Sequence, residues 1–344
     1  MRVKKINPKL RSRIILISIF LFSFFNVSYG EKIADLPMVM NPFFITIGHG
    51  RIYITEKNSS IHIFKLDNGN VVFEKTFGEK GEGPGEFKFI HRLSVKDDYL
   101  EIPSFGKYAR FTFEGKFIDE KKLPFRVFKN NIYKIGDNYL TRDYIFSPEK
   151  SETVIKLWDK NFNLIKKLGN MRGESTFTRI NPVPGYYLCL VANNSIYIVD
   201  SAMTTRIKIF DRDGKYRSEL KLPVSGIKLN SKLKEKIIGE LIQMINKEIW
   251  KSIKKRMFYP GFVPGLNWFG IDDETMIART YRFNDDKVEF VFFNTDGKVI
   301  KEMFMYDTGR ISNGMTFCFS DGKYYYLKEN FDEERWELFA EKIF

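Results

Sequence analysis

The sequence has 344 residues, of which 16% are aromatic and 29% are charged. A chain of this length can bury a large core or build an array of repeats, and its charge content excludes a bundle of membrane helices. The formal net charge of +13 suggests a nucleic-acid partner, but residues 1–30 contain six basic residues and no acid. The rest has 50 basic against 43 acidic residues, a surplus too small to indicate nucleic-acid binding.

Residues 1–30 have the pattern of a secretory signal peptide. A basic segment precedes an apolar run from Ile14 to Val27, which is shorter than the roughly 20 residues that a membrane-spanning helix needs. Ser28 and Gly30 are small residues placed for cleavage before Glu31. We therefore predict a periplasmic or secreted protein with no stable membrane span after cleavage; the alternative is an uncleaved N-terminal anchor.

One motif recurs six times: alternating apolar residues, an aromatic residue and, in most copies, a turn with Gly or Asn. The aromatic residues of successive copies lie 45 to 52 residues apart, with one longer step of 83. A four-stranded propeller blade needs roughly 40–50 residues. The aligned aromatic residues are Phe64, Phe113, Trp158, Phe210, Phe293 and Phe339. We predict an all-β fold, a six-bladed β-propeller of four-stranded blades over residues 31–344; an open β-array or a pair of sandwiches is the alternative.

The two ends of the chain predict how the ring closes. The first repeat offers strands at Phe43–Ile47, Ile52–Thr55, Ile61–Lys65 and Val71–Phe77. The sixth ends five residues after Phe339 and so lacks an outer strand. The apolar segment Ile33–Met40, and Met38–Met40 in particular, can supply this strand and remove the unpaired sheet edges.

The long step contains a helical insertion before blade 5, at about residues 224–263. Apolar residues recur every four positions from Leu233 to Ile253, which predicts one amphipathic helix over Leu229–Met257. Asn230 or Ser231 can cap its start, and Pro260 prevents its continuation. We expect this helix to pack on the ring with a solvated basic face; a helix lying on a membrane surface is the alternative.

The most specific string is Thr76–Phe87, Thr-Phe-Gly-Glu-Lys-Gly-Glu-Gly-Pro-Gly-Glu-Phe. With the motif before it and the Pro-rich stretch Arg256–Pro264, it resembles an exported bacterial six-bladed β-propeller family with NHL-like repeats. The resemblance spans about Ile33–Phe344 and implies fold and export, but no activity. Asp200 follows the family pattern, whereas Glu56 and Ser104 replace that Asp, which puts the turn bonding of blades 1 and 2 in question.

Chemical motifs are sparse. None of the three histidines, His49, His62 and His91, has a neighbour at metal-ligand spacing, and no Gly-x-Ser-x-Gly motif occurs. The Gly-rich string leads into a strand rather than a helix, so it does not fit a phosphate-binding loop. Cys189 and Cys318 fit buried free thiols better than a disulfide. We expect no metal and no cofactor.

Long segments at Gly78–Phe87, Asp143–Thr153, Gly169–Gly185 and Val224–Gly265 are predicted to open on one face of the ring. Repeat proteins often bind through such a face, and Arg offers a planar donor fork for carboxylate, phosphate or sulfate. The predicted ligand-binding residues are Arg142, Tyr144, Arg172, Arg179, Arg279, Tyr281 and Arg282. Each arginine could instead pair with a nearby acid such as Asp143, Glu149 or Glu174. The inserted helix emerges from the same face and is placed to act as a lid.

The sequence thus favours an exported binding or interaction module over an enzyme. Its expected partner is an anionic small molecule, a glycan or another envelope protein, and not nucleic acid. Two alternatives stay open: a hydrolase or lyase working at the mouth of the central tunnel, and a structural partner that docks into an envelope complex through the helix.

Overall fold

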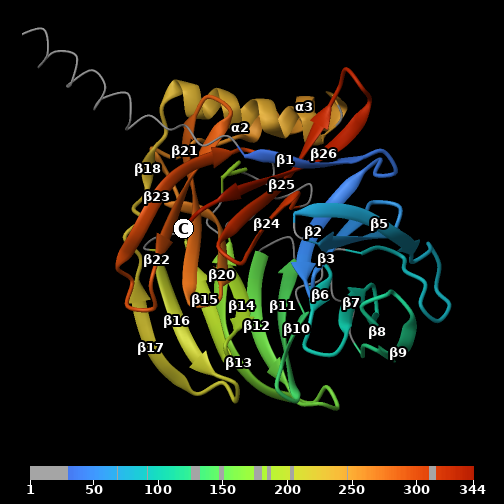
Figure 1. Ribbon diagram of the computed structural model, residues 1–344. Helices are drawn as coiled ribbons and strands as arrows, with labels where there is room; N and C mark the ends of the chain where they lie inside the picture. The colour runs from blue at the N-terminus through green and yellow to red at the C-terminus, as the bar shows by residue number, and fades with distance from the viewer. Residues whose placement is uncertain are drawn as a thin grey trace, which may run out of the picture.

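A computed structural model describes residues 30–344, except 68, 91, 125–131, 147–150, 174–179, 184–186, 202–204, 246 and 310–314. It is a six-bladed β-propeller of four-stranded antiparallel sheets, which confirms the predicted fold class. Figure 1 shows the blades following one another around a ring in chain order, from blue to red. Our predicted signal peptide lies outside the described residues.

In blades 1 to 5 the chain runs from the innermost strand to the outermost one. The strands of blades 1 to 3 are β2 (Pro42–Gly48), β3 (Arg51–Glu56), β4 (Ile61–Asp67), β5 (Asn70–Phe77), β6 (Ser94–Val95), β7 (Leu100–Ser104), β8 (Lys107–Phe111), β9 (Phe117–Lys122), β10 (Ile132–Ile135), β11 (Asn138–Phe146), β12 (Ser151–Trp158) and β13 (Leu164–Gly173). Those of blades 4 and 5 are β14 (Tyr187–Ala192), β15 (Ser195–Asp200), β16 (Arg206–Asp211), β17 (Tyr216–Lys221), β20 (Leu266–Asp272), β21 (Thr275–Asn284), β22 (Lys287–Phe293) and β23 (Val299–Tyr306).

Blade 6 combines both ends of the chain. It contains β24 (Phe317–Ser320), β25 (Lys323–Asn330), β26 (Arg335–Lys342) and, as its outermost strand, β1 (Glu31–Leu36). Strand closure is therefore confirmed, but Met38–Met40 does not form the strand. The strand starts earlier because Ala34 pairs with Leu338 and Leu36 with Trp336, and this register leaves Val39 buried in the connection to blade 1.

Apolar clusters fill all six interfaces between neighbouring blades. The second strands are buried on both faces because a blade lies on either side, which explains continuous apolar runs such as Ile196–Val199. The interface of blades 5 and 6 is rich in aromatic rings: Trp268 stacks on Phe319, with centroids 5.8 Å apart, and meets Phe317 edge to face. Such ring pairs account for part of the large Phe content.

The repeated motif occupies the third strand of each blade. A bulge at its aromatic residue recurs in the pairing with the fourth strand, at Phe64, Trp158, Phe210 and Phe293. In blade 2 the bulge lies at Phe111. The sequence alignment on Phe113 was therefore wrong by two residues, because Phe113 already belongs to the turn that Gly115 closes.

The insertion differs from the single helix that the periodicity predicts. It forms α2 (Ser231–Met244) and α3 (Lys247–Ile253), and a 3₁₀ turn follows at Lys254–Arg256. α2 ends at Met244 because the backbone of the next residue, Ile245, is extended. A two-stranded ribbon, β18 (Ile227–Lys228) with β19 (Phe262–Val263), closes the base of the insertion. Figure 1 shows α2 and α3 together at one edge of the molecule.

Candidate functional site

The inner strands of all six blades surround a central cavity of about 980 Å³. This volume is at the upper end of the range for small-molecule pockets, roughly 300–1,000 Å³. Most of its wall is apolar or aromatic and includes Phe44, Phe89, Tyr133, Trp268 and Phe319. A ligand in this cavity would therefore meet flat, apolar surfaces on most sides.

The ionisable groups of the cavity wall are mostly basic. Glu101 is the acid among the lining residues, and it faces Lys96 at 3.5 Å. The basic lining residues are Lys57, Arg92, Lys96, Lys134 and Arg142. An apolar wall strengthens the field of these cations because it excludes water, so the cavity favours negative charge.

Arg92, Arg142 and Lys57 lie at the same end of the ring, where the inner strands begin. Arg92 comes two residues before β6, and Arg142 follows Thr141, which pairs with the first residue of β10. Lys57 follows Glu56, which pairs with Pro42 at the start of β2. We call this end of the cavity the basic mouth.

Aromatic rings support both arginines of the basic mouth. The Arg92 guanidinium lies over the Tyr133 ring at 5.2 Å, and that of Arg142 lies over Tyr144 at 5.4 Å. Stacking fixes the plane of a guanidinium and leaves its N–H edge available. The pair Arg142 and Tyr144 was predicted from sequence, and the structure brings both into the cavity wall.

Arg142 keeps unused hydrogen-bonding capacity. Its Nη1 donates to the Tyr187 carbonyl at 3.3 Å, while its buried Nε has no hydrogen-bond partner among the described residues. Asp143, next to it in the chain, is bound to Lys156 at 2.7 Å instead. A guanidinium has five N–H donors, and a buried donor without an acceptor is costly. Because Arg142 lines the cavity, the terminal N–H groups that Tyr187 does not use can donate to a ligand there.

Both arginines also act on two groups of the cavity wall. Burial raises the pKa of Cys189 to about 12, and the charges of Arg142 and Arg92 oppose this shift. Burial likewise raises the pKa of Tyr133, again against Arg92 and Arg142. The two guanidinium groups thus act on the same part of the cavity wall, between blades 2, 3 and 4.

The other predicted site residues do not line this cavity. Arg279 is buried and bound to Asp307 at 2.5 Å, and Arg282 is bound to Glu289 at 3.0 Å. Tyr281 packs beneath α2. The two arginines pair with acids other than those named from the sequence, and all three side chains make contacts within the fold. Arg172 lies in β13, but its side chain is not described, and Arg179 lies outside the described residues.

Two further expectations about this face need correction. Most of Asp143–Thr153 is not a loop, because β11 and β12 extend to Phe146 and Ser151. The helix does not act as a lid in this structure: no described residue of α2 or α3 lines the cavity. α2 lies against blade 5 instead, where Lys236 binds Asp307 at 2.7 Å.

Sequence reasoning missed Arg92 and Lys57. Arg92 comes two residues before β6, a strand of only two residues, so no strong sequence pattern indicated an inner strand there. Lys57 belongs to a short turn within blade 1, and binding residues were predicted only in and beside the long segments. A rule that marks basic residues at the amino ends of inner strands would have found Arg92.

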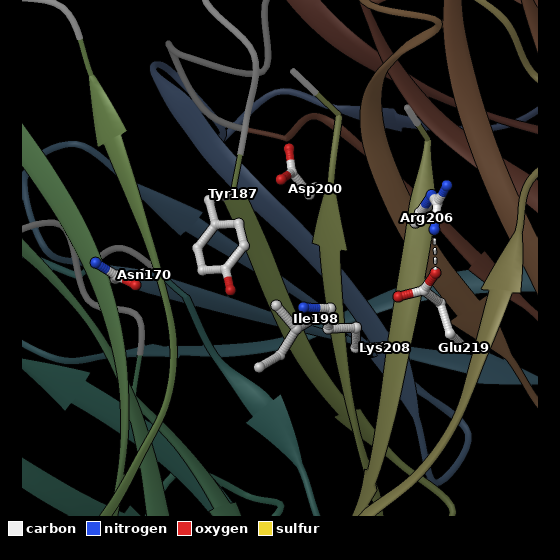
Figure 2. Close-up of a pocket in the computed structure, with 7 residues that line it drawn as sticks. All are labelled: Asn170, Tyr187, Ile198, Asp200, Arg206, Lys208 and Glu219. Atoms are coloured by element: carbon white, nitrogen blue, oxygen red, sulfur yellow. Dashed lines mark hydrogen bonds and ion pairs between the residues drawn. The ribbon is translucent and has the colours of Figure 1, made fainter. Parts of the chain in front are cut away.

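A smaller groove of about 240 Å³ lies between blades 3 and 4 (Figure 2). Its charges are balanced, with Arg206 and Lys208 against Asp200 and Glu219, and Arg206 donates to Glu219 at 2.7 Å. It is the weaker candidate because its cations and acids offset one another. In the described part of the chain, no three His, Cys, Asp or Glu side chains gather closely enough to hold a metal ion.

A match to a family model supports the fold. A model of a family described as "6-bladed beta-propeller" matches residues 38–184, which contain blades 1 to 3. Two similar solved structures are the computationally designed Ika8 protein and the AfRom2 CNH domain. The Ika8 protein shares 8% identity with a TM-score of 0.40, and the match covers 90% of this chain and 99% of Ika8. The AfRom2 CNH domain shares 10% identity with a TM-score of 0.41, and the match covers 92% of this chain and 99% of that domain. No curated protein matches the chain.

Proposed function

We propose that this protein is an exported binding module, and that its central cavity holds a ligand with an anionic group and a flat or apolar body. The observation that carries the proposal is the basic mouth, where Arg142 and Arg92 line the cavity and lie over the Tyr144 and Tyr133 rings. A carboxylate, phosphate or sulfate can accept from the forked N–H edge of arginine at two points. Arg92, stacked on Tyr133, is placed to share the same anion.

The cavity wall supports the second half of the proposal. Trp268, Phe319 and Phe44 present apolar surface around the space below the basic mouth. A small inorganic anion would leave this space to water, whereas an anion attached to a planar or aliphatic group would fill it. We therefore favour organic acids, nucleotides and acidic glycans with apolar substituents as the ligand class.

Export is proposed from the N-terminus. The basic residues before Ile14, the apolar run to Val27 and the small residues before Glu31 support it. Within the described part of the chain, no helix has the length and apolar character needed to cross a membrane. Mass spectrometry of the protein after expression with its full N-terminus tests this directly. Recovery of chains that start at Glu31 supports export, and recovery of chains with Met1–Gly30 intact contradicts it.

Ligand binding is tested with a panel of anionic compounds, with thermal shift as the first readout and calorimetry as the second. A ligand at the basic mouth should bind at least about 100-fold more weakly to Arg92→Ala/Arg142→Ala, since each hydrogen bond to a charged group contributes about 1.5–3 kcal/mol. Its affinity for the wild type should also fall with salt. Arg142→Lys keeps the charge but removes the donor fork, so it measures how much of the binding needs two-point contact.

The matched control is Lys65→Ala/Arg212→Ala, which removes the same charge from two exposed residues paired only with surface acids. This variant should bind as the wild type does. If the control weakens binding as much as the cavity variant does, the effect comes from net charge and not from the basic mouth. A ligand whose affinity ignores both the cavity substitutions and the salt concentration contradicts the proposal.

A further inference from the structure

The second helix of the insertion, α3 (Lys247–Ile253), has no buried residue, although all seven of its residues are described. Ile249 is 46% exposed. Trp250 and Ile253 are only partly buried, and helical geometry places them on the same side as Ile249. The helix therefore presents an apolar face of an isoleucine, a tryptophan and a second isoleucine at the surface.

α2 behaves differently and acts as the anchor of the insertion. Its Leu233 and Ile237 are buried against Val183 and Tyr281 in one apolar cluster. Lys236 binds Asp307 and lies 3.7 Å from the centre of the Phe283 ring. Leu233 and Ile237 of α2 are thus buried on the ring, although Ile242 near its end is 45% exposed, whereas α3 has no buried residue.

Basic residues surround the apolar face of α3. From residue 247 to residue 256 the chain carries one acid, Glu248. The basic residues of the same stretch are Lys247, Lys251, Lys254, Lys255 and Arg256. All four lysines are exposed. We call α3 with the 3₁₀ turn Lys254–Arg256 the basic helical edge.

We propose that the basic helical edge docks onto the surface of an anionic lipid bilayer. A helix that lies in a membrane interface combines Lys and Arg on its polar side with Trp and aliphatic residues on the other, as this edge does. Tryptophan suits the headgroup level because its ring is apolar and its N–H is polar. The lysines supply attraction to anionic headgroups.

The shape of this surface separates lipid from other acidic partners. A nucleic acid or an acidic protein segment would satisfy the lysines but would leave Ile249 and Trp250 in water. A bilayer satisfies both, because the lysines reach the headgroups while the apolar side chains enter the acyl boundary. One helix of seven residues buries little area, so we expect reversible, salt-sensitive binding that does not require a ligand in the cavity.

The test is co-sedimentation with vesicles of phosphatidylglycerol and phosphatidylcholine in equal parts, against vesicles of phosphatidylcholine alone. It uses the chain from Glu31, which contains all six blades and the closing strand, because the earlier basic and apolar residues would themselves bind vesicles. We expect binding at least about tenfold stronger to the anionic vesicles. The emission of Trp250 should shift to the blue on binding, with Trp250→Phe identifying its contribution.

Two variants and one control decide the outcome. Lys251→Glu/Lys254→Glu/Lys255→Glu should reduce binding about tenfold or more, since each reversal removes attraction and adds repulsion. Ile249→Ser/Trp250→Ser should reduce it with the charge intact. The control Lys65→Glu/Lys215→Glu/Lys298→Glu reverses three exposed lysines on the blades and should change binding less than about twofold.

Three results overturn the proposal: no binding to anionic vesicles, equal losses in the charge variant and the control, or binding without a shift of Trp250 emission. A fourth arm adds polyglutamate, an acidic polymer without acyl chains. If polyglutamate competes fully and Ile249→Ser/Trp250→Ser binds vesicles as the wild type does, the edge recognises acidic polymers and the lipid proposal is wrong.

Discussion

Gly85 in the Gly-rich turn between blades 1 and 2 has φ +76°, in the left-handed region that only glycine adopts freely. A Cβ added there would also lie 3.3 Å from the Phe117 ring. We expect Gly85→Ala to lower the free energy of unfolding by roughly 1–2 kcal/mol. Chemical denaturation measures it. The control is Gly239→Ala, in the open on α2, which should raise stability by up to about 1 kcal/mol. A neutral Gly85→Ala would contradict the need for a left-handed residue.

The neighbouring glycines Gly81 and Gly83 serve another purpose than Gly85 does. Gly81 and Gly83 do not have positive φ; their missing side chains leave room for Glu86, whose carboxylate accepts from the Gly83 amide at 2.9 Å. Composition alone predicts a tight turn there. The role of each glycine, left-handed backbone or space for a neighbour, depends on the position of the Glu86 side chain. The sequence does not show that position directly.

Glu56 performs the task that sequence comparison put in question. Its carboxylate accepts from the amides of Met40 and Asn41, at 2.5 and 2.9 Å, and so ties the closing strand's connection to blade 1. In blade 2 the Ser104 hydroxyl donates to the Phe89 carbonyl at 3.0 Å. Both replacements therefore keep a bond between the second strand and the incoming chain, because any polar group of suitable reach can make it.

The hydrogen bonds of the Glu56 carboxylate make the stability of the fold depend on pH. Burial on its own would raise the pKa of Glu56, but His62, whose Nε2 lies 3.5 Å from the carboxylate, and the hydrogen bonds from the Asn41 and Met40 amides lower it to about 2. A lowered pKa stabilises the fold above the ordinary value of 4.5, and this stabilisation is lost as pH falls from about 5 to about 2. The contribution is of the order of 3 kcal/mol.

Unfolding of wild type and Glu56→Gln from pH 7 to pH 2 measures this contribution. The two stability curves should differ most at neutral pH and converge toward pH 2, because the native carboxyl of the wild type is then protonated. Glu114→Gln, at an exposed residue, is the control and should follow the wild type. A constant gap between wild type and Glu56→Gln across the range would show that Glu56 contributes through shape and not through its charge.

At the scale of elements, β1 is the piece on which closure depends. Leu36 is fully buried and packs with Leu338 and Ile54 between blades 6 and 1. Deletion of residues 31–36 removes this side chain and exposes the edge of β26. We expect stability to fall by more than the roughly 2–5 kcal/mol that truncation of one buried leucine costs.

Thermal melting of the deletion, of Leu36→Ala and of a chain without Phe344 gives a graded test. Phe344 is half exposed and ends the chain beyond β26, so its removal controls for trimming a terminus. The Phe344 deletion should have the highest melting temperature of the three, Leu36→Ala a lower one and the β1 deletion the lowest. Equal melting of the two deletions would mean that β1 is not needed to hold the ring closed.

The sequence predicted those elements that depend on local periodicity, and it did not predict those features that depend on distant contacts. Strands and the insertion follow from local periodicity, so the blades were placed to within a few residues. The break between α2 and α3 does not: the apolar period of four runs through Ile245 without interruption. Arg142 was found because it adjoins Asp143–Thr153, a segment expected to be a loop, although it lies within β11. The pairing of Arg279 depends on Asp307, 28 residues further along the chain.

At the scale of the whole molecule, the basic mouth and the base of the insertion lie at the same end of the ring. The basic mouth lies where the inner strands begin, and the insertion leaves and rejoins the ring between blades 4 and 5 at that end. Its last turn is tied to the connection between blades 3 and 4, where the Ile180 amide donates to the Arg256 carbonyl oxygen at 2.9 Å. Docking of the basic helical edge would therefore bring the basic mouth near the same lipid surface.

The ring also predicts how the molecule unfolds, and its two cysteines can report on it. Cys189 lies in blade 4 and Cys318 in blade 6, and both are free and line the cavity. Burial raises the pKa of Cys189 to about 12 and that of Cys318 still further, so native thiolate is scarce at pH 8. We expect native labelling roughly a thousandfold or more slower than in the unfolded chain.

Because every blade packs against two neighbours, loss of one interface should destabilise the whole ring. Cys189→Ala and Cys318→Ala each leave one thiol, so mass spectrometry assigns each labelling rate. In rising denaturant the two thiols should become reactive together, at the midpoint that far-UV circular dichroism reports. If Cys318 reacts while Cys189 stays protected, blade 6 opens alone at the junction of the chain ends. The ring is then a series of separable blades and not one cooperative unit.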